Sequence, residues 1–302
     1  MDAGLNARAS RSSRRVGVLS ASSLLCIAIL AGCSPAPDGT STTTAVPTGV
    51  SVQLGQNRDQ YAGRSAIVRI ENGSEDDLVI VGLEVSGSAF TATTDRDRAS
   101  AVPAGQTKDL SVELPPAACG TAASDLRADV TLHLEDGAVI AITAVADPTA
   151  VLPRLHGAEC TVVGVDRIAD VTAESSVRLE GSGPSTVAVL TISVTPTGRR
   201  GRLDLVELRS TVLLKPAPDA STPTDASAWP LDRTVDATSG PKSIDVRIVP
   251  TRCDPHALAE DKVGTRFPLV VRIDGGPEAV MTLPLPAATA TALKDAVRIR
   301  CG

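Results

Sequence analysis

The stretch Leu110-Ser-Val-Glu-Leu-Pro-Pro-Ala-Ala-Cys119 is matched later in the chain by Ile244-Asp-Val-Arg-Ile-Val-Pro-Thr-Arg-Cys253. In both copies an alternating apolar segment runs into a proline and then a cysteine. After each cysteine comes a further strand-like segment that ends in Asp-Gly, at Asp136-Gly137 and at Asp274-Gly275. A match of this kind indicates that the chain contains one structural unit twice.

The match extends in both directions from this stretch. Segments that begin at Ser65 and Leu78 resemble segments that begin at Val187 and Leu203. Each half then closes with an apolar strand, a short helical stretch and a second cysteine. The duplication therefore covers most of the chain beyond its N-terminal segment.

The repeated segments have the period of β-strands. Val130, Leu132 and Leu134 alternate with polar residues, as in a strand with one buried face. Asp136-Gly137 predicts a two-residue hairpin, because both residue types tolerate positive φ. Short strands at regular spacing predict an all-β protein of two tandem immunoglobulin-like β-sandwich domains with short helices.

Six cysteines divide into two groups. Two lie near the N-terminus, and Cys119, Cys160, Cys253 and Cys301 remain, an even number that is typical of an oxidising compartment. Three pairings are possible in principle, and the repeat selects Cys119–Cys160 and Cys253–Cys301, one bridge in each domain. A zinc site is disfavoured because no Cys-x-x-Cys spacing occurs.

Composition excludes several classes of function. The aromatic residues are Tyr61, Phe90, Trp229 and Phe267 alone, too few for the stacking platforms of a carbohydrate-binding module. The formal net charge of −6 disfavours nucleic acid as a partner.

The N-terminal segment has the pattern of a secretion signal. Four arginines precede the apolar run from Val16 to Leu30, which is too short and too interrupted by serine for a membrane span. The sequence Leu30-Ala31-Gly32-Cys33 then resembles the lipobox of bacterial lipoproteins. The resemblance implies that the Cys33 sulfur carries diacylglycerol, with palmitate-type chains, and that cleavage makes Cys33 the first residue.

These features predict the domain organisation and the location. We expect a lipoprotein signal peptide at 1–32, a flexible tether at 33–48, and β-sandwich domains at 49–160 and 161–302. Signal removal takes away four arginines and one aspartate, so the formal charge moves from −6 to −9. The protein is expected on the extracytoplasmic face of the cell membrane, with the lipid bilayer as a partner through Cys33.

A helix is predicted from Asp254 to Gly264, with Asp254 as its cap and Pro255 in its first turn. His256 and Glu260 fall on one face of it, so with Asp254 they form a candidate metal site. A capped, solvated helix without metal is the expectation, and no cofactor is predicted. The block that begins at Cys253 resembles one in uncharacterised exported lipoproteins of actinobacteria, which implies a similar fold and no particular activity.

Other candidate features have ordinary structural explanations. His133 and Glu135 share the outer face of a strand, and His156 has no obvious partner. The equivalent turns 71–77 and 197–202 carry opposite charge, which suits either a docking surface or two solvated hairpin ends. The insertion 215–242 carries Trp229, either as a partner anchor or packed over a sheet edge.

No catalytic residues are predicted, because the chain has no Gly-x-Ser-x-Gly elbow, no nucleotide loop and only three scattered histidines. The expected function is a lipid-anchored binding or scaffold protein of the cell envelope, with an envelope protein as partner. An accessory or solute-binding subunit of an envelope complex or transporter is the first alternative. A metal-dependent enzyme that uses the His256 cluster is the second.

Overall fold

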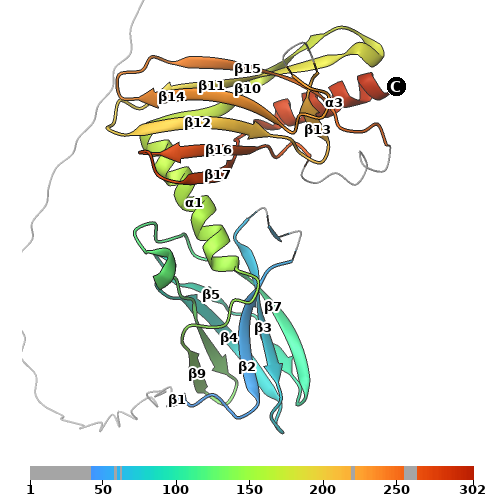
Figure 1. Ribbon diagram of the computed structural model, residues 1–302. Coiled ribbons are helices and arrows are strands. Elements are labelled where there is room, and N and C mark those ends of the chain that lie inside the picture. The colour runs from blue at the N-terminus through green and yellow to red at the C-terminus, as the bar shows by residue number, and fades with distance from the viewer. Residues whose placement is uncertain (1–41, 58–59, 62, 219–221, 255–263) are drawn as a thin grey trace, which may run out of the picture. The chain divides into compact units, whose positions relative to one another are not determined.

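The computed structural model describes residues 42–302 except 58–59, 62, 219–221 and 255–263. These residues form two β-sandwiches, one after the other along the chain (Figure 1). The all-β prediction and the duplication are confirmed.

The first sandwich contains two sheets. One has the order β2-β3-β7, and the other has the order β1-β9-β8-β4-β5, with β6 also paired to β4. The strands are β1 (Thr42–Thr44), β2 (Val50–Gly55), β3 (Ser65–Asn72), β4 (Leu78–Ser86), β5 (Thr94–Arg96), β6 (Ser100–Val102), β7 (Gln106–Glu113), β8 (Asp129–Leu134) and β9 (Ala138–Ile142). A 3₁₀ turn, η2 (Ala123–Asp125), lies between β7 and β8.

The second sandwich also contains two sheets, with the orders β10-β11-β15-β13 and β14-β12-β16-β17. The strands are β10 (Ala169–Glu180), β11 (Val187–Pro196), β12 (Arg202–Arg209), β13 (Leu214–Pro216), β14 (Ala228–Asp236), β15 (Lys242–Pro250), β16 (Pro268–Ile273) and β17 (Glu278–Thr282). The helical elements are α1 (Val151–Ile168), η3 (Gly183–Ser185) and α3 (Ala287–Cys301).

Both sandwiches have immunoglobulin-like topology. Strands β2, β3 and β7 take the A, B and E positions, and β4, β8 and β9 take C, F and G. In the second sandwich β10, β11 and β15 take A, B and E, and β12, β16 and β17 take C, F and G. Each segment pair matched in the sequence therefore occupies equivalent strands: β3 with β11, β4 with β12, β7 with β15, and β8 with β16.

Alternation along the strands builds each core. In β8, Val130 and Leu132 are buried between the two sheets, and Leu134 is partly buried against the same cluster. His133, which alternates with these residues along the strand, is half-buried. Aliphatic side chains fill almost the whole interior, and each sandwich has its own cluster of buried residues. A core of this kind needs few aromatic rings, in agreement with the composition.

The Asp-Gly turns differ between the two sandwiches. In the second, Asp274 and Gly275 both have positive φ, as the two central residues of a type I′ turn require, and the Gly276 N–H donates to the carbonyl of Ile273. In the first, only Gly137 has positive φ, and its N–H donates to the carbonyl of Leu134 across a three-residue loop. The two-residue hairpin expected at Asp136-Gly137 is therefore wrong, because Asp136 stays in the ordinary region and its carboxylate accepts from the Ala138 N–H instead.

Helix α1 contains the expected boundary at 160/161. Its first turn is capped by Asp147, whose carboxylate oxygens accept hydrogen bonds from the N–H groups of Val151 and Leu152, each at 2.8 Å. Val151 and Leu152 belong to the first core, whereas Val165 and Ile168 belong to the second. The helix therefore runs past Cys160 because its last turns have apolar surface of their own to bury.

Two segments expected to be irregular contain strands. Residues 42–44 of the expected tether form β1, which pairs in parallel with β9 and so covers an open sheet edge. The insertion 215–242 contains β14, which pairs with β12.

Trp229 in β14 is buried, its ring lies edge-on to Phe267 at 5.9 Å, and its N–H donates to the Arg247 carbonyl. Trp229 is thus a core residue and cannot serve as an exposed partner anchor.

Candidate functional site

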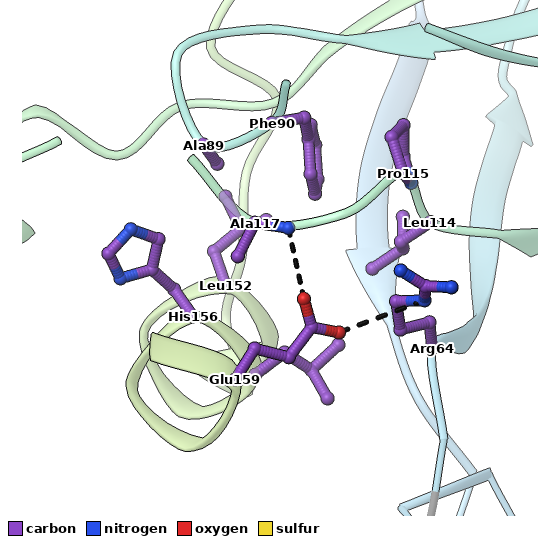
Figure 2. A pocket seen from close by; sticks show the side chains of 10 residues that line it. Arg64, Ala89, Phe90, Leu114, Pro115, Ala117, Leu152, His156 and Glu159 are labelled. Atoms are coloured by element: carbon purple, nitrogen blue, oxygen red, sulfur yellow. Dashed lines mark hydrogen bonds and ion pairs between the residues drawn. The ribbon is translucent and has the colours of Figure 1, made fainter. Parts of the chain in front are cut away.

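Helix α1 is joined to the first sandwich through the segment that follows β7 (Figure 2). One carboxylate oxygen of Glu159 accepts a hydrogen bond from the Ala117 N–H at 3.0 Å. The other lies 3.7 Å from Nε of Arg64, so Glu159 bridges the helix to two separate segments, as Figure 2 shows. These contacts orient the middle of α1 against the sandwich.

His156 contributes to the same joint. Its Nε2 lies 3.0 Å from the carbonyl oxygen of Ala118, and because a carbonyl only accepts, Nε2 carries the proton. The same nitrogen lies 3.7 Å from Sγ of Cys160. The expectation that His156 has no partner is therefore wrong, because the fold brings residues 117–119 against the helix.

The predicted disulfides are present in both sandwiches. Cys119 is bonded to Cys160 and Cys253 to Cys301, each with a Cα–Cα distance of 5.2 Å. In each case the bridge ties the connection after the E strand to the helix that follows the G strand. The disulfide is thus part of the duplicated unit.

The cavity beside this joint is too small for a ligand. Its lining residues include Phe90, Leu114, Leu152, His156 and Glu159 (Figure 2). Its free volume is about 10 Å³, roughly that of one water molecule. We conclude that the joint is structural.

A larger hollow lies on the outer face of the β14-β12-β16-β17 sheet. Its free volume is about 270 Å³, and its surface is mainly polar. The lining residues come from β12, β14 and β16, and they are Arg202, Asp204, Leu205, Val206, Asp232, Arg233, Thr234 and Arg272. We call these eight residues the arginine hollow.

Cross-strand pairing places the charges of the arginine hollow in rows. Asp204 lies opposite Thr234 on one side and Arg272 on the other. The Asp204 carboxylate accepts from the Thr234 hydroxyl at 2.6 Å and from Nε of Arg202 at 3.0 Å, and Nη2 of Arg202 lies 2.9 Å from the same carboxylate. Arg272 in turn forms an ion pair with Glu278 at 2.5 Å, so charge alternates across β12, β16 and β17.

Hydrogen bonding keeps the central carboxylate ionised. The bond from Arg202, followed by the bond from Thr234, holds the pKa of Asp204 below its usual value. The Asp204 side chain is 17% exposed, whereas that of Arg202 is 60% exposed. The ionised Asp204 carboxylate therefore holds the guanidinium group of Arg202 in place, while other N–H groups of that guanidinium remain accessible to solvent.

An irregularity in two strands shapes the hollow. The register of β12 with both of its neighbours shifts between Leu205 and Glu207. Relative to β16, Val206 is an extra residue, whereas β14 has two residues, Leu231 and Asp232, opposite Val206. Opposite it, Asp232 has a φ of 45°. Asp232, Arg233 and Thr234 are all exposed in succession, although Arg233 pairs with the buried Leu205. The bulge thus turns Arg233 outward to the face that carries Arg272.

The residues of the arginine hollow are not recognisable as a group in the linear sequence. Arg202 and Asp204 are visible as an alternating pair, but Arg233 and Arg272 are distant in sequence. Only strand pairing brings them together. Charged residues at outward positions of three strands could have indicated the site, but only if the pairing register of those strands were known. That register shifts at a bulge that the sequence does not reveal.

Two further candidate groups have partners or positions that can be stated. His133 lies 3.1 Å from Glu84 on the neighbouring strand, and no contact with Glu135 is present among the described residues. The oppositely charged turns 71–77 and 197–202 both join the B strand to the C strand, so they are equivalent positions, as predicted. Arg199 and Arg200 are exposed.

The remaining predicted sites lie mainly outside the described residues. Cys33, His256 and Glu260 are not among them, and Asp254 is. Within the part of the chain that the structure describes, no group of three or more His, Cys, Asp or Glu side chains could hold a metal ion. In the same part, no helix is both long enough and apolar enough to span a membrane.

Comparison with known proteins assigns no family to the chain. No protein-family model matches it, and no curated protein matches it in sequence. Among solved structures, red sea bream transglutaminase is 14% identical, with a TM-score of 0.24 over 80% of this chain and 32% of that one. The BSP domain of a biofilm-associated protein is 9% identical, with a TM-score of 0.21 over 81% and 60%. The calcium-binding domain CBD12 of CALX1.1 is 11% identical, with a TM-score of 0.18 over 80% and 88%.

The chain spans about a third of the length of the transglutaminase and 60% of the length of the biofilm-associated domain. With TM-scores of this size, these similarities carry no functional implication for this chain. The sandwich assignment rests on the strand order itself.

Proposed function

We propose that this protein is a lipid-anchored binding or scaffold protein on the extracytoplasmic face of a bacterial cell membrane, without catalytic activity. The observation that carries the proposal is the disulfide repeated in each sandwich. Disulfides persist in oxidising compartments, and they are rare in the cytosol. They therefore support export, which the N-terminal signal pattern also indicates.

Anchoring through Cys33 follows from the lipobox resemblance. A diacylglycerol on its sulfur supplies two acyl chains, and two chains are what stable membrane attachment requires. Eight residues separate Cys33 from the first residue of β1. At no more than roughly 3.5 Å per residue, a segment of that length reaches at most about 30 Å.

A binding or scaffold role suits the described surfaces. The apolar cavity beside α1 accepts no ligand larger than water, so the candidate contact surfaces are the outer faces of the sheets and the loops. The arginine hollow is a specific observation in favour of the second candidate, a solute-binding or accessory subunit of an envelope complex.

The Cys33→Ala variant tests the anchor. We expect it to be released from membranes or to persist as an uncleaved precursor, because it has no sulfur for lipid attachment. Wild type should incorporate labelled palmitate and fractionate with membranes at the mature size. Cys26→Ala is the matched control, since Cys26 lies within the apolar run of the signal and should be dispensable. A Cys33→Ala protein of mature size in the membrane fraction would contradict the anchor.

A further inference from the structure

We propose that the arginine hollow binds a small soluble ligand that carries a multivalent oxyanion, either a phosphoryl group or clustered carboxylates. The inference deepens the proposed binding function and rests on it. The hollow lies on the second sandwich, at a site that contains no part of the predicted lipid anchor.

The arginine hollow contains guanidinium N–H donors that are available to a ligand. Three guanidinium groups and two carboxylates line the hollow, and Glu278 pairs with Arg272 from the neighbouring strand, so free N–H donors and not net charge distinguish this surface. Arg233 makes one hydrogen bond among the described residues, to the Asp232 carbonyl at 3.3 Å, and no ion pair. Each guanidinium has five N–H donors in a planar fork that matches carboxylate and phosphate oxygens.

Irregular backbone in β12 and β14 places Arg233 on the outer face of the sheet. In a regular strand Arg233 would point inward, because its cross-strand partner Leu205 is buried. The extra residue of β14 opposite Val206 and the left-handed conformation of Asp232 together turn it outward. Conformations of this kind cost free energy, and they occur often beside binding sites. Here they accompany the exposure of Arg233, which has no ion pair among the described residues, in the same hollow as Arg202 and Arg272.

Two arginines of the hollow are held in place before any ligand binds. Arg202 is held at Nε and Nη2 by Asp204, and Arg272 is held by Glu278. Side chains that are fixed before binding lose less conformational entropy when a ligand arrives. The volume of about 270 Å³ suits a ligand of small-metabolite size, below most drug-sized pockets.

Isothermal titration calorimetry of the full-length protein in detergent tests the proposal. The probes are inorganic phosphate, glycerol phosphate and citrate, titrated at constant ionic strength against a chloride reference. We expect saturable binding of at least one probe, and the comparison among them separates phosphoryl from carboxylate recognition. No saturable binding of any probe would overturn the proposal, while the Cys33 fractionation would be unaffected.

Two variants with opposite expected effects on affinity make the test specific to the hollow. Arg233→Gln should weaken binding about tenfold, since it removes charge-assisted hydrogen bonds. Arg233 is exposed and makes no ion pair among the described residues, so the variant should fold normally. Asp232→Asn should strengthen binding several-fold, because asparagine tolerates positive φ and the lining loses a negative charge.

Matched controls separate the site from net charge. Arg98→Gln and Asp97→Asn make the same charge changes at exposed positions of the first sandwich. We expect both to leave the affinity within twofold of wild type. If the control variants shift the affinity as much as the hollow variants do, binding is diffuse and the proposal is wrong.

Discussion

Asp274 shows how one residue can connect three elements of the second sandwich. It lies in the β16–β17 turn with a φ of 52°. One carboxylate oxygen accepts from the Arg202 N–H at 2.8 Å, at the start of β12, and the other accepts from Arg167 Nη2 at 2.8 Å, near the end of α1. These bonds hold the pKa of Asp274 below its usual value, with the backbone N–H of Arg202 as the larger cause.

A pH dependence of stability follows from this shift. Because the folded-state pKa is lowered, the stabilisation is present above the pKa of the unfolded state, near 4, and is lost as pH falls through the folded-state value. Asp274→Asn keeps the turn but loses the charge. Urea unfolding should show wild type to be more stable than the variant at pH 7, with the difference shrinking toward zero near pH 2.

Asp97→Asn is the control for this series, since Asp97 is exposed and has no hydrogen bond or ion pair through its side chain among the described residues. It should give the same stability as wild type at pH 7. A wild-type advantage over Asp274→Asn that grows on acidification would contradict the assignment.

At the scale of elements, α1 departs most from what its own sequence favours. It contains Gly157 and Gly164, residues that are unfavourable inside a helix. A Cβ at Gly164 would lie 2.7 Å from Cδ1 of Ile273, so this glycine permits a close approach to β16. Gly157 is exposed and has no heavy atom within 4 Å of a Cβ placed there. Tertiary packing therefore explains one glycine, and nothing in the structure explains the other.

Gly157→Ala should accordingly stabilise the protein by about 0.5–1 kcal/mol, because alanine restricts the unfolded chain and favours the helix. Chemical denaturation of wild type and variant measures the change. Gly137→Ala is the opposite case, since Gly137 has a φ of 84° that alanine adopts only with strain. We expect that variant to be destabilised, and a loss of stability in Gly157→Ala would show a contact that the helix surface does not reveal.

At the scale of the whole molecule, each sandwich carries its own core and its own disulfide. The Cys119–Cys160 bridge closes a loop with a sequence separation of 41, and the Cys253–Cys301 bridge one of 48. In the loop-entropy model each bridge contributes about 4 kcal/mol. The last turn of α1 belongs to the second core, so it keeps its packing when the first bridge is absent.

Replacing both Cys119 and Cys160 by serine should therefore lower the melting transition of the first sandwich and leave that of the second nearly unchanged. The double variant at Cys253 and Cys301 should do the reverse. Differential scanning calorimetry under non-reducing conditions measures both. Equal shifts of all transitions in both variants would instead show that the two sandwiches unfold as one unit.

The sequence by itself determined the duplication, the β class, the pairing of the four cysteines and the aliphatic nature of the cores. These features depend on local alternation and on the comparison of one half with the other, which a linear sequence contains. It also located the equivalent turns of opposite charge.

Tertiary structure alone decided the rest: the passage of α1 from one core to the next, the β1 strand on an open edge, the burial of Trp229, and the arginine hollow. Each of these depends on register between strands that are distant in sequence. In β12 the extra residue Val206 moves the buried positions from Leu203 and Leu205 to Leu208, and in β14 the two residues opposite Val206 precede the exposed Arg233. The period of a strand is two residues, so one inserted residue reverses the face of every side chain that follows, and no local pattern reveals where that reversal occurs.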